Sequence, residues 1–253
     1  MSRQPWQPAL SPNAWLRWEA VRQLIPPDAR SVLEVGCGRG GFAVRLAEGR
    51  RYVGVEPDAV SAEVARMRLL AHGVDGDVRV GDVSVVDPAD EFDLVCAFEV
   101  IEHVEDDGAF VRACAGRVGP GGTLLLTTPA GESRFGIADE MVGHYRRYER
   151  ERLARLITEA GLQRASIEHY GAPFAYVLEG VRTGIAKTLQ RRTRAQSAAE
   201  RTAVSGRLMQ PGDGVIAPAV WAGMLAPRLL QRVAPRRGPS LVAVARRPAS
   251  SST

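Results

Sequence analysis

The sequence has few cysteines and no long apolar run. Its three cysteines are odd in number, and none has the C-x-x-C spacing. This usage is typical of a reduced, intracellular protein. No stretch approaches the ~18 apolar residues that a membrane-spanning helix needs. The N-terminus, MSRQPWQPALSPNAW, lacks the apolar core and cleavage site of a signal peptide. We therefore expect a cytoplasmic protein, with any membrane contact being peripheral.

The sequence also lacks a large excess of either charge. It has 33 basic and 29 acidic residues, and its net charge is +4. This balance alone predicts neither nucleic acid nor a membrane as a partner. The excess positive charge lies in residues 173–238, whose only acids are Glu179, Glu200 and Asp213. Aromatic residues are not interleaved there as in grooves for single strands, so we expect no nucleic-acid partner.

Apolar strand-like runs alternate with helical patterns along the chain. Near-continuous apolar strands separated by helices predict an α/β fold with a parallel sheet that is covered on both faces. The expected strands are 31–35, 51–55, 77–81, 93–98, 122–128, 164–170 and 240–247. The expected helices are 13–25, 40–48, 58–72, 106–118 and 149–160.

The length suits a single domain, residues 1–253, with two elaborations. Residues 1–27 are expected to form an N-terminal helical cap. Strands six and seven are separated by about 65 residues, too many for a bare loop, so 173–238 is expected to be a basic, partly apolar helical insertion that forms a lid or acceptor region. Its segment 214–233 fits a solvated surface, or a patch that contacts a membrane or a lipid-like acceptor. The apolar side of that patch would comprise Trp221, Met224, Leu225, Leu229, Leu230 and Val233.

The most informative stretch is the glycine-rich turn after the first strand, EVGCGRGG at 34–41. It satisfies both the G-x-G-x-x-G dinucleotide pattern and an acidic-x-G-x-G-x-G pattern. Glu56 ends the second strand, where a carboxylate reaches ribose hydroxyls in either ligand class. Glu34 suits a ligand ammonium group better than a pyrophosphate. Asp82, after the third strand, can accept a hydrogen bond from the amine of adenine.

These residues, together with FDLVCAFEVIEHVEDD at 92–107 and GPGG at 119–122, resemble the class I S-adenosylmethionine-dependent methyltransferases. The chain looks most like the subgroup that includes ubiquinone-biosynthesis O-methyltransferases, over residues 28–170 and the final strand. The resemblance implies a Rossmann-like, seven-stranded, mostly parallel sheet of order 3-2-1-4-5-7-6 with the last strand antiparallel. It also implies S-adenosyl-L-methionine as cofactor, bound by Glu34, Gly36, Gly38, Gly40, Glu56, Asp82, Val83 and Phe98.

The activity that this resemblance implies is transfer of a methyl group, by in-line displacement, to a small or lipid-like acceptor with a hydroxyl group. The N-terminal helix, with Trp15 and Trp18, is expected to close over the cofactor. Two other functions stay open: a nicotinamide-dependent oxidoreductase and a non-catalytic binding module on the same fold. The oligomeric state is left open.

Several of these residues also fit plainer roles. The glycines can serve close packing alone, and Glu56 can be a charge at a helix N-terminus. Asp82 can simply form a turn. Cys37 is interpreted as a small loop residue rather than a redox centre.

Glu99, Glu102 and His103 have E-x-x-E-H spacing, which on a helix places all three on one face. Together with His144 they could hold a divalent metal, as in small-RNA methyltransferases that this segment resembles. We expect no metal here, and we expect Glu99 to line the acceptor side.

The segment GHYRRY at 143–148 resembles the G-H-x-R-x-[FY] segment that these methyltransferases place at the rim of the active site. A neutral imidazole accepts a proton near pH 7, so His144 is the first candidate for a general base and His103 the second. In the alternative interpretation, His144 and Arg146 only anchor this loop.

Overall fold

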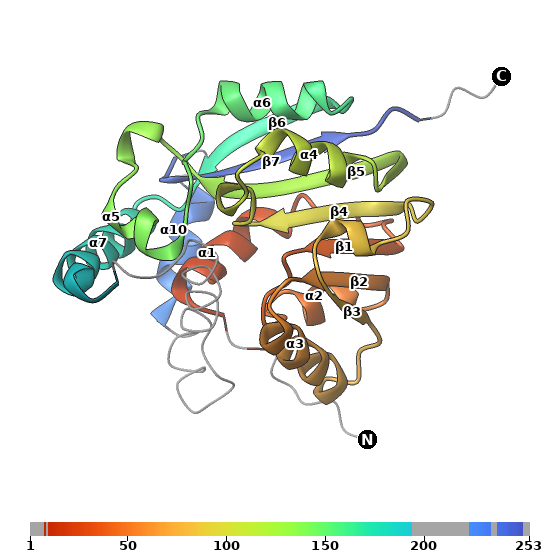
Figure 1. Ribbon diagram of the computed structural model, residues 1–253, viewed down its shortest axis with the longest axis horizontal. Helices are drawn as coiled ribbons and strands as arrows, with labels where there is room; N and C mark the ends of the chain where they lie inside the picture. Colours follow the sequence, from red (N-terminus) through yellow and green to blue (C-terminus); the bar gives the residue numbers. More distant parts are fainter. Residues whose placement is uncertain (1–7, 9, 194–222, 234–236, 250–253) are drawn as a thin grey trace.

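The computed structural model describes residues 8, 10–193, 223–233 and 237–249. One sheet has the order β3-β2-β1-β4-β5-β7-β6 (Figure 1). Strands β1 to β5 pair in parallel, whereas β7 lies antiparallel between β5 and β6. The predicted fold class and strand order are therefore confirmed. The strands are β1 Ser31–Val35, β2 Arg51–Glu56, β3 Asp77–Val80, β4 Phe92–Phe98, β5 Val118–Pro129, β6 Gln163–Tyr170 and β7 Ser240–Arg246.

Helices cover both faces of this sheet. The α-helices are α1 Pro12–Val21, α2 Ala43–Ala47, α3 Ala59–Ala71, α4 Asp107–Ala115, α5 Ile137–Val142, α6 Arg150–Glu159, α7 Phe174–Thr193 and α10 Leu225–Val233. Three short 3₁₀ turns accompany them: η1 Val83–Val85, η2 Ile101–His103 and η3 Glu132–Arg134.

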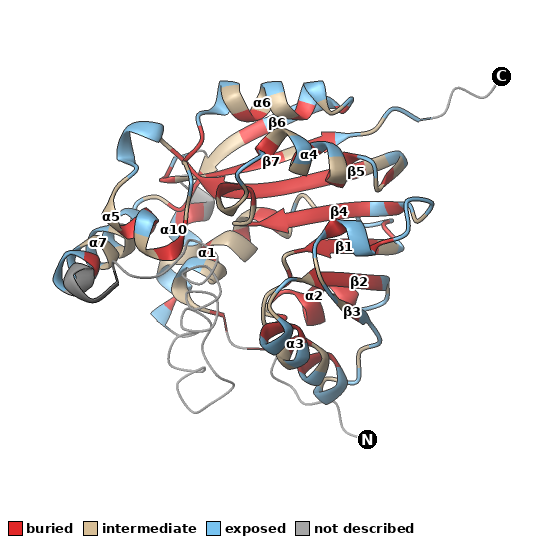
Figure 2. Cartoon of the chain, in the orientation of Figure 1, coloured by how far each residue is buried: buried red, intermediate tan, exposed pale blue. Residues whose placement is uncertain are grey.

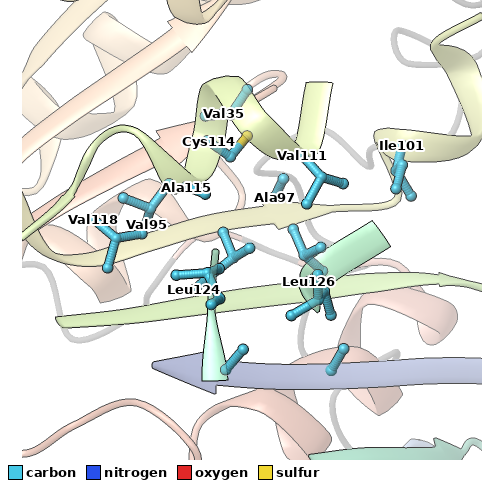
Figure 3. Close-up of a cluster of buried hydrophobic side chains, with 14 of the residues drawn as sticks. Val35, Val95, Ala97, Ile101, Val111, Cys114, Ala115, Val118, Leu124 and Leu126 are labelled. Carbon is cyan, nitrogen blue, oxygen red and sulfur yellow. The ribbon is translucent and has the colours of Figure 1, made fainter. Parts of the chain in front are cut away.

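The central strands are buried on both faces, which explains their near-continuous apolar sequences. On one face, Leu33 packs in a cluster with Val111 of α4 and Leu153 of α6. On the other face, Val32 packs in a cluster with Leu46 of α2 and Leu69 of α3. Figure 2 shows the buried strands between more exposed helices, and Figure 3 shows part of the α4 side of the core.

Several elements differ from the expected ones. Strand β5 begins at Val118 instead of residue 122, and α4 ends at Ala115 instead of residue 118. Helix α1 ends at Val21 instead of residue 25, and turns carry the chain to the Pro26-Pro27 pair. Helix α2 begins at Ala43 because the glycine-rich turn continues to residue 41 and Phe42 still lies in a turn. Helix α5 lies in a segment for which no helix was expected; it is only 6 residues long and is followed by Gly143, whose φ is +81°. So short a helix has too few turns to show a periodicity.

The described part of the insertion consists of α7 and α10, while residues 194–222 lie outside the described residues. Arg228 of α10 forms an ion pair with Glu19 of α1 at 3.1 Å, so this helix is fastened to the N-terminal one. Within the ranges described, no helix is long and apolar enough to cross a bilayer.

The predicted apolar side of the insertion is partly wrong. Met224, the residue before α10, is buried in one cluster with Leu16 of α1 and Ala175 of α7. Leu225, Leu229 and Leu230 are exposed, as expected. Trp221 and the side chain of Val233 lie outside the described residues.

Candidate functional site

The predicted cofactor residues gather at one edge of the sheet. Parallel strands β1 to β4 all end there, and the chain passes from β1 to β2 on one side and later to β4 on the other. In open α/β sheets, ligands bind outside the carboxyl ends of the strands at such a switch point. The sheet topology therefore brings Glu34, Glu56, Asp82 and Phe98 to the ligand-binding edge.

The glycine-rich turn begins directly after β1. Backbone N–H groups of Gly36 and Cys37 donate to the Val55 carbonyl, at 2.8 and 3.1 Å. Gly36, Gly38 and Gly40 have φ of +74°, +55° and +74°, a region that strains other residues.

Two of these glycines also permit close approaches. A Cβ on Gly36 would lie 2.5 Å from a methyl group of Val100, and one on Gly40 would lie 2.9 Å from the Cα of Ala65 in α3. Gly40 therefore serves helix packing as well as the turn, so the plainer role of close packing applies at this position.

Glu34 lies beneath this turn and is almost fully buried. Its carboxyl group accepts a hydrogen bond from the hydroxyl of Tyr52 at 2.5 Å. Gly54 leaves room for that hydroxyl, because a Cβ there would lie 2.7 Å from it. Burial raises the pKa of Glu34 to about 8. A nearby cation such as a ligand ammonium would favour the ionised form.

Glu56 ends β2 and faces the turn. One of its carboxylate oxygens accepts the N–H of Gly38 at 2.9 Å, and the other accepts the N–H of Asp58 at 3.0 Å. Burial raises its pKa. Its carboxylate thus holds the glycine-rich turn against the start of α3.

Asp82 follows β3 and caps η1, accepting the N–H of Ser84 at 2.8 Å. Hydrogen bonds from Ser84 lower its pKa. The turn-forming role is thus present in the structure. Val83, the next residue, is buried.

Phe98, at the end of β4, connects this edge to α1 through a series of contacting aromatic rings. Its ring meets Phe42 edge-on at 5.3 Å, and Phe42 lies 5.5 Å from the ring of Trp18. Arg45 lies over the rings of Trp15 and Trp18 and donates to the carbonyl of Gly41 at 2.7 Å. Helix α1 is therefore packed against the glycine-rich turn.

A second polar cluster follows the end of β4. Glu99 has a φ of +57°, rare for a residue with a side chain, and the 3₁₀ turn starts only at Ile101. The interpretation that E-x-x-E-H occupies one face of a helix is therefore wrong. Glu99 instead forms an ion pair with Arg17 of α1 at 3.3 Å and contacts the hydroxyl of Tyr170 at 3.4 Å.

Glu102 is fully buried in this cluster. Its Oε2 accepts a hydrogen bond from Thr128 at 3.1 Å, while its Oε1 has no hydrogen-bond partner among the described residues. Burial, and then the charge of Glu99, raise the pKa of Glu102 well above its usual range. A buried carboxyl oxygen without a partner calls for an explanation.

His144 follows α5 and is oriented by Asp139 of that helix. Its Nδ1 lies 3.0 Å from Asp139 Oδ1, and its Nε2 lies 4.0 Å from Glu102 Oε1. Burial alone would raise the pKa of Asp139, but the bonds from His144 and Arg147 outweigh it and lower the pKa to about 2. An ionised Asp139 favours a proton on Nδ1 and leaves the lone pair on Nε2.

His103 packs edge-on against the ring of His144, with 4.6 Å between centroids. Burial and the nearby His144 lower the pKa of His103 to about 3. His103 is therefore neutral at pH 7 and a weak base, which makes it the poorer candidate for proton transfer, whereas Asp139 orients His144 for that role. Glu102, His103 and His144 each offer one donor atom within 4.8 Å of the others, and this set suits a divalent metal.

Loop anchoring is carried out by the residues after His144. Arg146 pairs with Asp107 at 3.0 Å and donates to the carbonyl of Glu105 at 2.7 Å. Tyr148 is fully buried and its hydroxyl donates to Asp107 at 3.0 Å.

Sequence reasoning missed several polar residues of this cluster. Arg17, Asp139 and Arg182 carry no local motif, because they come from α1, α5 and α7 and meet only through the fold. Arg147 lies within the segment 143–148, but at a position where the G-H-x-R-x-[FY] pattern accepts any residue. The one available signal was Asp139 itself, an acid five residues before a candidate catalytic histidine.

Comparison with known proteins agrees with this geometry. A family model described as a methyltransferase domain matches residues 14–167. The chain belongs to this methyltransferase family, and its sheet order and glycine-rich turn are those of the class that uses S-adenosylmethionine. The residues at the turn fit that cofactor, since Gly36, Gly38 and Gly40 keep the loop clear and Glu34 and Glu56 supply carboxylates beside it.

Among the curated relatives, ubiquinone biosynthesis O-methyltransferases recur. The one from Xanthomonas axonopodis pv. citri is 37% identical over 123 residues, covering 47% of this chain and 50% of that protein. The one from Bradyrhizobium diazoefficiens is 35% identical over 109 residues, covering 43% of each. The chain thus spans about half the length of the curated relatives that it matches.

Solved structures share the fold at low identity. Haemonchus contortus phosphoethanolamine N-methyltransferase 2, in complex with S-adenosyl-L-methionine, superposes with a TM-score of 0.59 at 18% identity, over 94% of this chain and 54% of that one. The [4+2]-cyclase SpnF gives a TM-score of 0.61 at 19% identity, over 94% and 81%. One fold therefore carries different chemistries, and the activity must be argued from the site.

Proposed function

We propose that this protein transfers a methyl group from S-adenosylmethionine to a hydroxyl oxygen of a small or lipid-like acceptor. The observation that carries the proposal is the pairing of Asp139 with His144, at 3.0 Å, beside the residues that follow β4. Oxygen as the accepting atom is also supported by the name O-methyltransferase among the relatives. A precursor of ubiquinone belongs to the proposed acceptor class.

When bound, the cofactor supplies a methyl group on a sulfonium sulfur that is already activated for displacement. The chain therefore needs to align the acceptor, exclude water and take up one proton. An acceptor hydroxyl would lose its proton on methylation, and Nε2 of His144 would take up that proton. Asp139 accepts from Nδ1 and stabilises the imidazolium that results.

Helix α1 has the role of excluding water in this proposal. Trp18 packs on Phe42, which follows the glycine-rich turn, while Arg17 of the same helix reaches Glu99 beyond β4. One rigid helix thus contacts both the cofactor side and the acceptor side.

The proposal is tested by following S-adenosylhomocysteine formation and ¹³C-labelled methyl transfer to hydroxylated acceptors. His144→Asn is expected to lower kcat by about 100-fold or more and to leave the affinity for S-adenosylmethionine unchanged. The matched control is His72→Asn at the end of α3, which should keep full activity. Label that appears on nitrogen or carbon instead of oxygen would contradict the proposed acceptor class.

A second role for the histidine cluster is favoured by Oε1 of Glu102, which has no hydrogen-bond partner in the described ranges. Together with His103 and His144 it offers a donor set for a divalent cation that would bind the acceptor oxygen. Treatment with EDTA separates the two roles. Proton transfer by His144 alone predicts full activity after treatment, whereas the metal role predicts a loss that added Mg²⁺, Mn²⁺ or Zn²⁺ reverses.

A further inference from the structure

The cluster around Asp139 contains more cationic groups than its carboxylates can satisfy. Within the described ranges, a chain of ion pairs links guanidinium and carboxylate groups from η3, α5, α7 and the loop after α5. The guanidinium groups are those of Arg134, Arg147 and Arg182, and the carboxylates are those of Asp139 and Glu179. The pairing leaves one positive charge in excess.

Arg182 is the guanidinium with the poorest pairing. Among the residues that the structure describes, its one ion pair runs from Nη2 to Asp139 Oδ1 at 3.5 Å. That carboxylate already accepts bonds from Arg147, His144 and the N–H of Gly136, at 2.9 to 3.0 Å. Three of those bonds end on Oδ2, and His144 binds Oδ1, the oxygen that Arg182 approaches. At 3.5 Å the contact of Arg182 is longer than an ordinary hydrogen bond, so Asp139 holds it only weakly.

Other features of Arg182 point to a ligand rather than to a structural role. Its Nε is buried and has no hydrogen-bond partner in the described part of the chain. Its side chain is 29% exposed and can be reached, whereas that of Arg147 is 3% exposed and is held by two carboxylates. A guanidinium fork with unused donors suits a carboxylate or another planar anion.

Arg182 also lies beside the candidate catalytic group. It shares Asp139 Oδ1 with His144, so a single carboxylate oxygen separates the guanidinium from the imidazole. Its charge also acts on the ring of His103. An acceptor with its hydroxyl at His144 would therefore place a neighbouring group near Arg182.

We propose that Arg182, supplied by α7 of the insertion, binds an anionic group of the acceptor, so that the protein selects hydroxyl compounds that carry a carboxylate or a similar anion. This inference rests on the proposed methyltransferase function and adds the charge of the acceptor to it. It also assigns a task to α7: the insertion brings the specificity residue to the cluster formed by α5 and β4.

Two pairs of probes, matched in shape and different in charge, test the inference. They are hydroxybenzoate with hydroxybenzamide, and 3-hydroxydecanoate with 3-hydroxydecanamide. Binding of each is measured by calorimetry on the full chain saturated with S-adenosylhomocysteine. We expect the anion of at least one pair to bind about tenfold more tightly than its amide, as one charge-assisted hydrogen-bond pair would provide.

Arg182→Gln should reduce that preference to about twofold or less, and Arg182→Lys should keep part of it. The matched control is Lys187→Gln, which removes an exposed cation from the same helix and should leave the preference intact. Circular dichroism and the affinity for S-adenosylhomocysteine report on folding.

The inference is overturned if the parent protein shows no preference for either anion, or if Arg182→Gln keeps the preference. Both results are compatible with normal binding of S-adenosylhomocysteine and would leave the proposed function standing. Failure of the parent protein to bind S-adenosylhomocysteine would instead contradict the proposed function.

Discussion

Replacing Asp139 by asparagine tests the arrangement on which the proposed chemistry depends. The carboxylate is almost fully buried and accepts bonds from His144, Arg147 and the N–H of Gly136. These bonds lower its pKa from 3.8 to about 2. At ~1.4 kcal/mol for each pKa unit, the ionised form stabilises the folded state by about 2 kcal/mol. Asparagine keeps the shape and loses this contribution.

The loss of stability in Asp139→Asn should depend on pH. The folded-state pKa lies below the unfolded one, so the stabilisation is fully present above pH ~4 and is lost as the pH falls toward 2. Urea unfolding should therefore show Asp139→Asn about 2 kcal/mol less stable than the parent at pH 7, with the gap narrowing from pH 4 downward. Asp106→Asn, at the exposed N-cap of α4, should change stability by only a few tenths of a kcal/mol. A gap that is absent at pH 7, or that widens in acid, would refute the reasoning.

The other predictions concern the glycine-rich turn and the insertion. Gly40→Ala should cost about 1–3 kcal/mol in urea unfolding, because its Cβ would meet the backbone of α3 at a positive φ; Gly161→Ala, also at positive φ but facing open space, should cost less, and equal losses would contradict the packing argument. Glu34→Gln should make the cofactor-free protein about 1–3 kcal/mol more stable at pH 8: the raised pKa means that the parent loses stability as the pH rises from 4.5 toward 8, whereas a neutral amide does not. The same variant should bind S-adenosylmethionine more weakly, and a stability gain that is as large at pH 4 would count against this account. Replacing the exposed Leu229 and Leu230 by aspartate should lower sedimentation with anionic liposomes by about tenfold; unchanged sedimentation would remove the case for a lipid-contacting face.

The fold could be predicted from the sequence because its signals are local and regular. Apolar runs such as 31–35 and 51–55 match β1 and β2 closely, and the glycine-rich turn between β1 and α2 marks the ligand edge. Gly36, Gly38 and Gly40 have the backbone conformation that their spacing suggested. The predicted helices were wrong where short-range geometry overrides the periodicity of apolar residues, as at α5 and at the end of α1.

The acceptor side could be predicted only in part. His144 and His103 were recognisable by their residue type, but the partner that orients His144 lies in a short helix without a motif. The prediction that the E-x-x-E-H residues share one face of a helix was wrong, because Glu99 adopts a φ of +57° and leaves the helical path. Arg17 and Arg182 reach the cluster from α1 and α7, and such long-range neighbours leave no trace in the spacing of one sequence.

The most direct measurement is calorimetric titration of the purified protein with S-adenosylmethionine and, separately, with NAD. We expect saturable binding of S-adenosylmethionine, weakened strongly by Glu34→Ala, and no binding of NAD. Binding of NAD in place of S-adenosylmethionine would contradict the central claim that the turn at 34–41 holds a sulfonium cofactor.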